Sequence, residues 1–374
     1  MAGGKKKKRS AARVFLAIAL LLAASALAVT YLAGGELSLA GARRAFSGLR
    51  ARARATEFVF EPGFDAVFAP HGDGIIAAGG MGIQVLDGYG EETARAAVRL
   101  ENPTVSASDG TAAVFDVGGT VLRILEGGVV KAAPEVPGAI ISCSVGGGGA
   151  VALCTRESGG YKGCVTVYSA EDFEEVYKWY AADGYVLSAS LADDNKRLAV
   201  LTVRESGSRL VLLDLDSTEL KAEAVLDGEL GLELRYLGEK LALVARGGVW
   251  IVDKNGAGER IFDFAGRYLR GYSLTGDGFL AVYLHDYAVG SRGAVETFGF
   301  GGEALGRLET DRELLGMSAR GDGLALLWED GAALYGKTLE PRETAGETNP
   351  AVTAVIMRRD GRYIAIEPRG AYIK

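Results

Sequence analysis

Histidine, cysteine and proline are scarce in this chain of 374 residues, which contains two, three and eight of them respectively. Two histidines, His71 and His285, are too few for a three-histidine metal site, and the sequence contains neither an HExxH motif nor a nucleophile elbow. The three cysteines form no CxxC pair and have no histidine close to them in the sequence, which argues against a zinc site. We therefore expect no metal site, and no residue is singled out as catalytic.

The cysteines, Cys143, Cys154 and Cys164, all fall within one short stretch of the chain. Cys154 and Cys164 lie on adjacent strands of a predicted hairpin, where their side chains could face each other. One interpretation is that all three are small, buried, apolar thiols. The other is a disulfide between Cys154 and Cys164, provided that the domain lies outside the cytoplasm.

An excess of basic residues is also lacking over most of the chain. Residues 1–55 carry eleven Lys and Arg against a single acid, Glu36, whereas the remainder carries 30 bases and 47 acids, a formal charge of −17. Nucleic-acid binding depends on clustered Lys and Arg, so we expect no nucleic-acid partner. The glycine-rich run at residues 146–149 lacks the Lys and Ser/Thr of a phosphate-binding loop and is interpreted as a turn, so no cofactor is expected.

Glycine, by contrast, is abundant, with 54 residues, and an Asp-Gly turn or a close relative of it recurs eight times after residue 70. Each turn stands just before an apolar run of β-forming residues. The first residues of successive turns are separated by 36, 38, 47, 44, 39, 45 and 38 residues. A period near 40 built from short strands is typical of a β-propeller with one four-stranded blade per repeat. The turns are Asp73-Gly74, Asp109-Gly110, Gly147-Gly148, Asp194-Asn195, Gly238-Glu239, Asp277-Gly278, Asp322-Gly323 and Asp360-Gly361.

The fold class that this repeat predicts is an all-β propeller of eight four-stranded blades, with seven blades as the alternative if one weak repeat is absorbed. Apolar residues run almost continuously through the second and third strands of each repeat, as expected for strands buried between blades. After Asp360-Gly361 only two strands remain before the chain ends at Lys374. The outer strand that this repeat lacks is supplied, in our interpretation, by residues 57–60, from Glu57 to Phe60, which closes the ring. The propeller is therefore expected to span residues 57–374.

Serine marks the innermost strand of most repeats. Strands converge at the central channel of a propeller, where bulky side chains would collide. We interpret these serines as packing residues rather than as catalytic ones. They are Ser106, Ser108, Ser142, Ser144, Ser188, Ser190, Ser273 and Ser318.

The amino-terminal residues predict a membrane segment. A basic tail occupies residues 1–13, and an uncharged run of 20 residues follows from Val14 to Ala33. That length matches the ~20 residues that cross a bilayer as a helix. The basic tail predicts a cytoplasmic amino terminus, which places the large domain outside the cell membrane. The alternative is a cleaved signal peptide and a secreted propeller, because Ala26-Leu27-Ala28 resembles an A-x-A cleavage site. We favour an uncleaved signal-anchor.

Residues 34–56 are predicted to be an arginine-rich juxtamembrane linker. Leu39, Ala42, Phe46 and Leu49 recur at roughly helical spacing with arginines between them. This pattern suits a segment that lies on an anionic membrane surface. A solvated basic stem is the alternative.

Two hairpin segments resemble known propeller repeats. Residues 82–87 (GIQVLD) and 248–253 (GVWIVD) resemble the third-strand motif of PQQ-like and YVTN-type repeats. The regular Gly-His and Trp-Asp dipeptides of WD40 repeats are absent, and without a regular blade tryptophan the resemblance implies no quinone cofactor. With its basic start, membrane helix and arginine-bearing stem, the chain resembles an uncharacterised family of single-pass bacterial membrane proteins with a domain of unknown function. That resemblance implies no site residues.

The connections between second and third strands are where a binding site is expected. They are predicted to be long in three repeats, at residues 156–162, 204–209 and 285–292, and such loops project from one face of a propeller. Tyrosine and arginine recur in binding hot spots. The alternative is that these exposed hairpins vary in length without having a binding function. The predicted binding residues are Arg156, Tyr161, Arg204, His285, Asp286, Tyr287 and Arg292.

These features favour a membrane-anchored extracytoplasmic scaffold that binds an envelope protein or glycan. The alternative is an envelope hydrolase or lyase with acidic residues at the channel mouth, since propellers also carry enzymes. A sensory role would require a partner, because the residues before the predicted helix are too few for an output domain.

Overall fold

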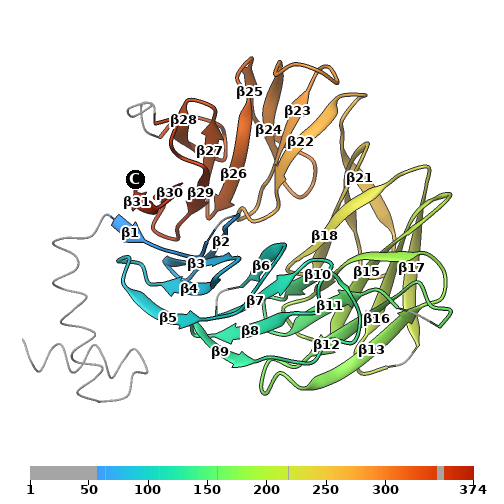
Figure 1. Cartoon of the computed structure of the whole chain (residues 1–374). Coiled ribbons are helices and arrows are strands. Elements are labelled where there is room, and N and C mark those ends of the chain that lie inside the picture. Colours follow the sequence, from blue (N-terminus) through green and yellow to red (C-terminus); the bar gives the residue numbers. More distant parts are fainter. Residues whose placement is uncertain (1–56, 64, 109, 158, 218, 343–348) are drawn as a thin grey trace, which may run out of the picture. The chain divides into compact units, whose positions relative to one another are not determined.

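The structure, a computed structural model, describes residues 57–374 except 64, 109, 158, 218 and 343–348. The described residues form 31 β-strands in eight antiparallel sheets that follow one another around a ring, an eight-bladed β-propeller (Figure 1). The predicted all-β class and the eight blades are confirmed, and the seven-bladed alternative is wrong. Within the described part no helix is long and apolar enough to cross a membrane. The predicted basic tail, membrane helix and linker at residues 1–13, 14–33 and 34–56 lie outside it.

We number the blades in chain order and their strands from the channel outwards. Blade 1 contains β2 (Val67–His71), β3 (Gly74–Gly79), β4 (Gly82–Leu86) and β5 (Glu92–Ala96). Blade 2 contains β6 (Pro103–Ala107), β7 (Thr111–Asp116), β8 (Leu122–Glu126) and β9 (Val129–Ala132). Blade 3 contains β10 (Ile140–Val145), β11 (Val151–Thr155), β12 (Gly163–Tyr168) and β13 (Glu175–Ala181). Blade 4 contains β14 (Tyr185–Leu191), β15 (Arg197–Arg204), β16 (Gly207–Asp214) and β17 (Leu220–Asp227).

The second half of the ring repeats this plan. Blade 5 contains β18 (Gly231–Leu237), β19 (Lys240–Ala245), β20 (Gly248–Val252) and β21 (Gly258–Asp263). Blade 6 contains β22 (Tyr268–Ser273), β23 (Leu280–His285), β24 (Gly293–Phe298) and β25 (Ala304–Thr310). Blade 7 contains β26 (Leu314–Arg320), β27 (Gly323–Trp328) and β28 (Gly331–Gly336). Blade 8 contains β29 (Ala354–Met357), β30 (Tyr363–Glu367), β31 (Gly370–Ile373) and, outermost, β1 (Glu57–Val59).

Blade 7 has three strands in the described part of the chain instead of the predicted four. Beyond β28 the N–H of Arg342 donates to the carbonyl of Leu334 at 2.9 Å, and an isolated bridge joins Tyr335 to Pro341. Proline has no N–H to donate, so it cannot extend a strand ladder in both directions. The residues that follow, 343–348, lie outside the described part.

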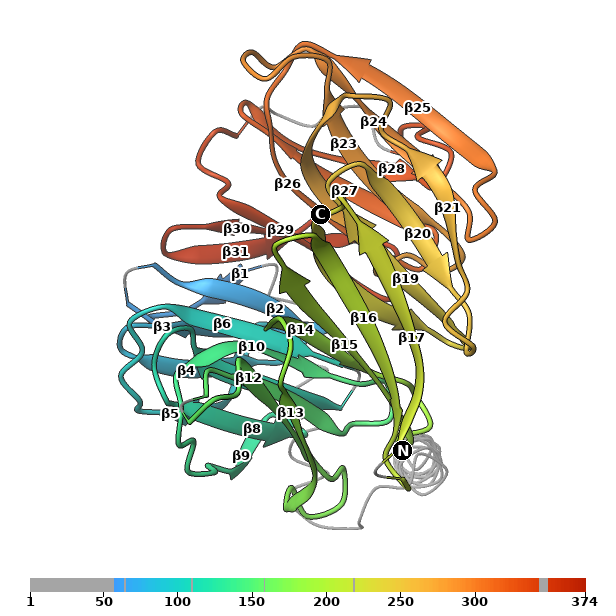
Figure 2. The same ribbon diagram turned by 90° about the vertical axis from the view of Figure 1, so that its right-hand side faces the viewer.

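The two ends of the propeller meet in blade 8. β1 pairs antiparallel with β31, with Glu57 opposite Tyr372 and Val59 opposite Gly370. Figure 2 shows β1 beside β31, with β2 of blade 1 next to them. The ring is thus closed by strands from opposite ends of the described chain.

Each blade is a meander, so its strand ends divide between two faces of the ring. The turns that join first to second strands and third to fourth strands lie on one face, called here the turn face. The connections between second and third strands, and between successive blades, lie on the other, called here the loop face. All eight predicted turns join a first to a second strand. In blade 4 Asp194 Oδ1 accepts from the N–H of Lys196 at 2.9 Å, and Asn195 adopts φ 55°, which few residue types tolerate.

The hydrophobic core consists of eight clusters, one at each contact between neighbouring blades. The second strands contribute most, and β3, β7 and β27 are buried at every residue. Because each sheet is covered on both faces, its central strands need no polar alternation. The cluster between blades 8 and 1 contains Phe58, Ile75 and Ile364, so the closing contact is as apolar as the others.

Serine hydroxyls join the innermost strands of neighbouring blades, which belong to separate sheets. Ser144 Oγ donates to the carbonyl of Ala189 at 2.6 Å, and the N–H of Tyr236 donates to Ser190 Oγ at 3.0 Å. These serines therefore do more than pack, because the small hydroxyl also satisfies a main-chain group of the next blade. Six serines form such bridges. Ser142 Oγ donates to the carbonyl of Leu187 at 2.9 Å, and the other five are called here the ladder serines: Ser106, Ser144, Ser190, Ser273 and Ser318.

The innermost strands of blades 3 to 7 each contain a β-bulge near the loop face. In each of them one residue has no partner on the second strand, and the register shifts past it. A bulge bends its strand and redirects the side chain of the extra residue. The extra residues are Ile141, Leu187, Leu232, Arg270 and Leu315.

Candidate functional site

The predicted binding residues come from three blades and all lie on the loop face. Blades 3 and 4 are neighbours, whereas blade 6 is separated from blade 4 by blade 5. The structure therefore divides these residues into two groups. Arg156, Tyr161 and Arg204 form the first group, and His285, Asp286, Tyr287 and Arg292 form the second.

Two further tyrosines lie close to the first group. The rings of Tyr161 and Tyr180 are 4.9 Å apart, and Lys162 Nζ lies 5.4 Å from the ring centre of Tyr185, which begins blade 4. All three tyrosines are exposed. We call Tyr161, Lys162, Tyr180 and Tyr185 the tyrosine cluster. It spans the junction of blades 3 and 4.

Arg204 lies near this junction but does not belong to a long loop. Its Nη1 lies 3.0 Å from Asp183 Oδ2 in the connection between the two blades. Arg204 also pairs directly with Gly207, so a two-residue turn joins β15 to β16. The predicted long loop at residues 204–209 is wrong because Ser208 is buried and its Oγ accepts from the N–H of Gly231 in the connection to blade 5 at 2.8 Å. That contact holds the segment in the sheet.

The second group surrounds a pocket of about 530 Å³ in blade 6. Residues 286–292 join β23 to β24 above it, and Arg292 Nε lies 3.5 Å from Asp286 Oδ2 across the loop. Tyr287 and Val289 project from the loop and are exposed. The pocket is lined by Arg270, Tyr283, His285, Ala288, Val289, Gly290, Ser291, Glu313 and Leu314.

His285 is buried beneath this loop, whereas Tyr287 and Val289 are exposed. Its Nδ1 accepts from Arg270 Nε at 3.3 Å, and its ring packs edge-on against Tyr283 at 4.7 Å. Burial and the charge of Arg270 lower the pKa of His285, so the imidazole is neutral at physiological pH. With Nδ1 accepting, the proton resides on Nε2, which has no hydrogen-bond partner among the described residues. His285 thus supports the floor of the pocket and is not exposed for general-base chemistry.

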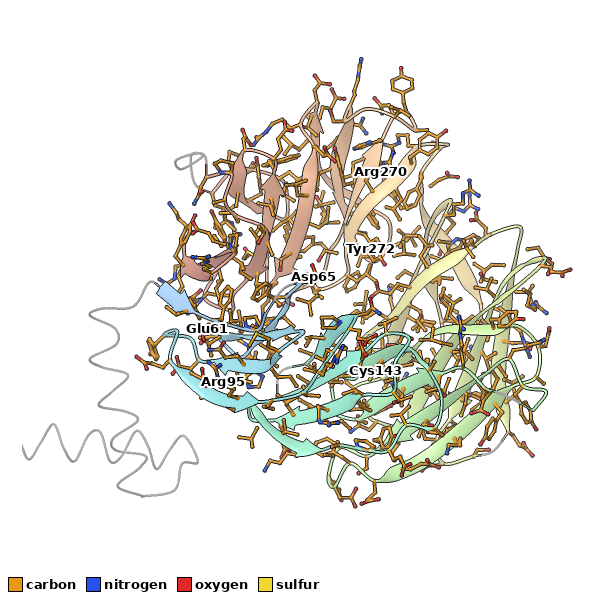
Figure 3. All side chains as sticks on the ribbon, viewed as in Figure 1. Glu61, Asp65, Arg95, Cys143, Arg270 and Tyr272 are labelled. Atoms are coloured by element: carbon orange, nitrogen blue, oxygen red, sulfur yellow. The ribbon has the colours of Figure 1, made fainter. Side chains whose placement is uncertain are left out.

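Arg270 was not among the predicted residues, although it connects the pocket to the channel side of the blade. It is the extra residue of the bulge in β22, and its Nη2 also donates to the carbonyl of Ala288 in the loop. Figure 3 shows Arg270 and, two residues farther along the same strand, Tyr272. No turn or periodicity signal marks a bulge, so only the strand pairing reveals the position.

The loop face carries most of the exposed apolar surface. Among the described residues, Val129, Val176 and Leu220 lie at the turn-face ends of their strands, and no exposed large apolar side chain lies in a turn of that face. Five lie on outermost strands: Val59, Val129, Val176, Leu220 and Val225. The others lie in loops, blade connections or strand ends at the loop face: Met81, Tyr161, Tyr180, Tyr185, Leu230, Leu232, Tyr268, Tyr287, Val289 and Leu315.

The channel carries acidic residues, as the hydrolase alternative requires. Asp193, Glu233 and Asp277 line a cavity of about 1050 Å³ in it. Glu233 Oε2 accepts from the Tyr272 hydroxyl at 2.7 Å. No hydrogen bond links two carboxyl groups in the described part of the cavity, so a shared-proton acid pair does not arise there. Across the residues that the structure describes, no group of three His, Cys, Asp or Glu is placed to hold a metal ion.

The three cysteines are buried and unpaired. Cys154 lies opposite Val165 and Cys164 lies opposite Thr155. Residues directly opposite share a face of the sheet and successive residues alternate, so Cys154 and Cys164 point to opposite faces. The buried-thiol interpretation is confirmed and the disulfide is wrong.

Burial also makes these thiols unreactive. It raises the pKa of Cys154 to about 12 and raises that of Cys143, and the nucleophilic form of cysteine is the thiolate. We expect iodoacetamide at mildly alkaline pH to leave Cys143 and Cys154 unmodified in the folded protein and to modify all three cysteines after denaturation. Mass spectrometry of tryptic peptides measures this. Rapid labelling of Cys154 in the folded protein would contradict the burial.

Comparison with known proteins agrees with this fold. Residues 62–216, which cover blades 1 to 3 and most of blade 4, match a family model described as "Family of unknown function (DUF5711)". This match supports the resemblance to a domain of unknown function. No curated protein matches the chain.

Several solved structures share the architecture. BamB from Moraxella catarrhalis is 16% identical over 85% of this chain and 97% of its own, with a TM-score of 0.55. The C-terminal WD40 domain of Sif2 is 9% identical over 84% of this chain and 97% of its own, with a TM-score of 0.56. The Cps50 (Swd1) β-propeller domain from Myceliophteria thermophila is 12% identical over 74% of this chain and 98% of its own, with a TM-score of 0.53. At these identities the likeness is one of fold: this chain is a divergent β-propeller.

Proposed function

We propose that this protein is a binding scaffold of the cell envelope, tethered by residues 14–33 with the propeller outside, and that another protein docks on its loop face. The observation that carries the proposal is the concentration of exposed apolar side chains on that face. Burial of apolar surface drives most protein association, and exposed apolar surface marks interaction sites.

The composition of the loop face favours a protein partner. Tyrosine and arginine dominate binding hot spots because each offers a large contact area together with a polar group. The tyrosine cluster supplies three exposed rings next to the Arg204–Asp183 ion pair. The bulges of blades 5 and 7 add the exposed aliphatic side chains of Leu232 and Leu315.

Strand β1 enters the propeller at the turn face. Glu57 lies opposite Tyr372 near the end of β31, which places it at the turn-face end of β1. The residues before Glu57 are therefore joined to the propeller on the turn face.

The tether is tested by extracting membranes of cells that express the full chain with alkaline carbonate. We expect the protein to stay in the membrane pellet and to migrate at its full mass of 39.1 kDa. External protease should degrade the propeller in intact spheroplasts. A shorter, soluble product in the extracellular fraction would instead identify residues 14–33 as a cleaved signal peptide.

The docking surface is tested by crosslinking in living cells followed by mass spectrometry. Tyr161→Asp and Tyr185→Asp should reduce recovery of the crosslinked partner by about tenfold or more, the effect of losing a hot-spot side chain. Leu220→Asp and Val225→Asp are the matched controls, because they place the same charge at exposed apolar positions of the outermost strand β17. Equal losses in all four variants would reject the loop face. Recovery of glycan instead of protein would reject a protein partner.

A further inference from the structure

The ladder of serines is interrupted in blade 5. When blades 3 to 7 are aligned on their bulges, the third residue after the extra residue is Ser144, Ser190, Ser273 or Ser318 in four of them. In blade 5 the extra residue is Leu232, and the third residue after it is Arg235. A position that bridges to the next blade elsewhere therefore carries a long cation here.

The innermost strands of blades 5 and 6 also make little contact with each other. β18 and β22 have the least contact of any two neighbouring innermost strands in the ring. A cavity of about 1050 Å³ opens beside them and is lined by Glu233, Arg235, Tyr272 and Ser273, among others. A volume of this order is ample for a small organic molecule, whose pockets measure roughly 300–1000 Å³.

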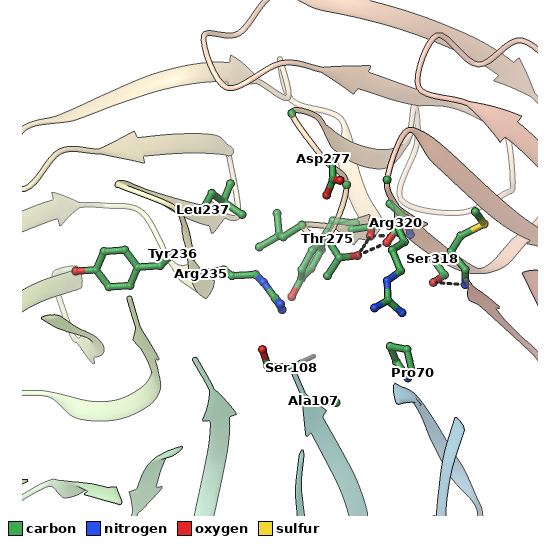
Figure 4. A pocket seen from close by; sticks show the side chains of 18 of the residues that line it. Pro70, Ala107, Ser108, Arg235, Tyr236, Leu237, Thr275, Asp277, Ser318 and Arg320 are labelled. Carbon is green, nitrogen blue, oxygen red and sulfur yellow. Dashed lines mark hydrogen bonds between the residues drawn. The ribbon is translucent and has the colours of Figure 1, made fainter. Parts of the chain in front are cut away.

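Arg235 has no partner in the described part of the molecule. The described arginines whose side chains make no hydrogen bond, ion pair or ring contact are Arg156, Arg235, Arg246 and Arg369. The other three are exposed, whereas Arg235 is partly buried in the channel wall. Its side chain extends into the open space of the cavity (Figure 4). Its N–H groups therefore face the cavity without an acceptor among the described residues, which leaves them available to an anion.

The acid on the same strand, Glu233, is hydrogen-bonded to Tyr272 of blade 6. Burial and the charge of Glu233 raise the pKa of Tyr272, so its hydroxyl stays protonated and donates to Glu233 Oε2. Other blades carry Cys143, Ala189, Leu234 or Met317 at the position of Tyr272, relative to the bulge. Blades 5 and 6 thus depart from the repeat together, and the departure gives Glu233 a hydrogen-bond donor in the next blade.

A second guanidinium faces the same space. Arg320 of β26 extends toward it from the side opposite Arg235, and Ser108 lies between them below (Figure 4). Arg320 Nη1 donates to the carbonyl of Gly72 at 3.1 Å, which fixes this arginine on the wall. Two arginines and a hydroxyl from three blades therefore converge on one cavity.

We propose that the channel holds a small organic anion whose carboxylate or phosphate oxygens are bound by the guanidinium of Arg235. Arginine presents parallel N–H groups that match both kinds of oxygen pair. Residues 56–374 carry a formal charge of −17, so large polyanions are repelled, and a small anion has to be selected by local contacts inside the cavity. This site is independent of protein docking on the loop face, since the cavity lies among the turn-face ends of the innermost strands.

The test is isothermal titration of the detergent-solubilised full chain with three probes: inorganic phosphate, pyrophosphate and citrate. We expect at least one to bind, and Arg235→Gln to raise its Kd by about 10–100-fold, the range for losing a hydrogen bond to a charged group. Arg235→Lys keeps the positive charge but lacks the parallel N–H groups of arginine. Its Kd should therefore lie between those of the wild type and Arg235→Gln. Tighter binding of pyrophosphate assigns a phosphorylated ligand, and tighter binding of citrate assigns a carboxylated one.

Arg246→Gln is the matched control, because Arg246 belongs to the same blade, is equally unpartnered and lies on the loop face. It should leave the Kd unchanged.

Tyr272→Phe should weaken binding by freeing Glu233, and Glu233→Gln should strengthen it. Thermal unfolding without probe verifies that each variant is folded. The proposal is overturned if no probe binds the wild type at millimolar concentration, or if Arg235→Gln and Arg246→Gln weaken binding equally.

Discussion

Replacing Phe58 with alanine lowers the free energy of unfolding by about 3–5 kcal/mol, the cost of emptying a buried phenylalanine site. Phe58 is only 1% exposed and packs with Phe60, Ile75 and Ile364 where blade 8 meets blade 1. Its strand is the short β1, held to one neighbour, β31. Loss of the side chain therefore weakens both the strand and the closing contact. Urea unfolding of the solubilised full chain, followed by tryptophan fluorescence, measures the change.

Val59→Ala is the control for this experiment. Val59 is the next residue of the same strand, but it is 66% exposed. Its replacement should change stability by less than about 0.5 kcal/mol, as is usual for surface positions. If both variants lose the same stability, strand formation rather than burial of Phe58 holds the ring closed. If neither does, β1 is dispensable.

Replacing Arg358 with glutamine lowers the free energy of unfolding by about 1.5–3 kcal/mol, the range for hydrogen bonds that involve a charged group. Arg358 is 7% exposed and follows β29 in blade 8. Its Nη1 donates to the carbonyls of Asp73 at 2.8 Å and Gly88 at 3.1 Å, both in blade 1. Its Nε and Nη2 donate to Asp360. In the variant, the carbonyls of Asp73 and Gly88 in blade 1 lose the hydrogen-bond donor that blade 8 supplies.

Arg362→Gln separates this effect from a general loss of charge. Arg362 also donates to Asp360, at 2.7 Å, but its side chain is largely exposed. An exposed ion pair contributes about 0–1 kcal/mol, so the variant should be close to wild type in urea unfolding. A larger loss for Arg362→Gln than for Arg358→Gln would show that the carbonyls of blade 1 do not depend on Arg358.

The same site makes stability depend on pH. Burial alone would raise the pKa of Asp360, but hydrogen bonds from Arg358 and Arg362 outweigh it and lower the pKa from 3.8 to about 2. The unfolded carboxyl binds a proton first, so its stabilising contribution is present above the unfolded pKa of 3.8 and is lost as pH falls toward about 2. The wild type should thus lose stability more steeply over this interval than Asp360→Asn.

The eight blades were predictable because turn chemistry is local. Asp194-Asn195 signals a turn by its own side chains, and its relatives recur at a nearly constant interval. The number of strands in blade 7 was not predictable in the same way, because it depends on how far the chain pairs with β28 before Pro341 interrupts the ladder.

The candidate sites depend on contacts between blades and were only partly predictable. The segment at residues 204–209 contains glycine and serine, as loops do, yet the bond from Gly231 to Ser208 draws it into β16. Cys164 pairs with Thr155 rather than with Cys154, and this offset of one residue places Cys154 and Cys164 on opposite faces of the sheet. The replacement of a ladder serine by Arg235 appears only after the repeats are aligned on their bulges, and a bulge is defined by strand pairing.

The pairing of β1 with β31 has a consequence for biosynthesis. The strand that completes blade 8 is among the first parts of the propeller to leave the ribosome, whereas its partner comes last. At roughly 5–20 residues per second, β1 waits on the order of a quarter of a minute to a minute for β31. Throughout that interval Phe58 lacks Ile364 and the other partners that blade 8 supplies. During synthesis, the apolar side chains of β1 therefore have to be kept from aggregating. A chain truncated before blade 8 contains seven blades and a ring that is not closed.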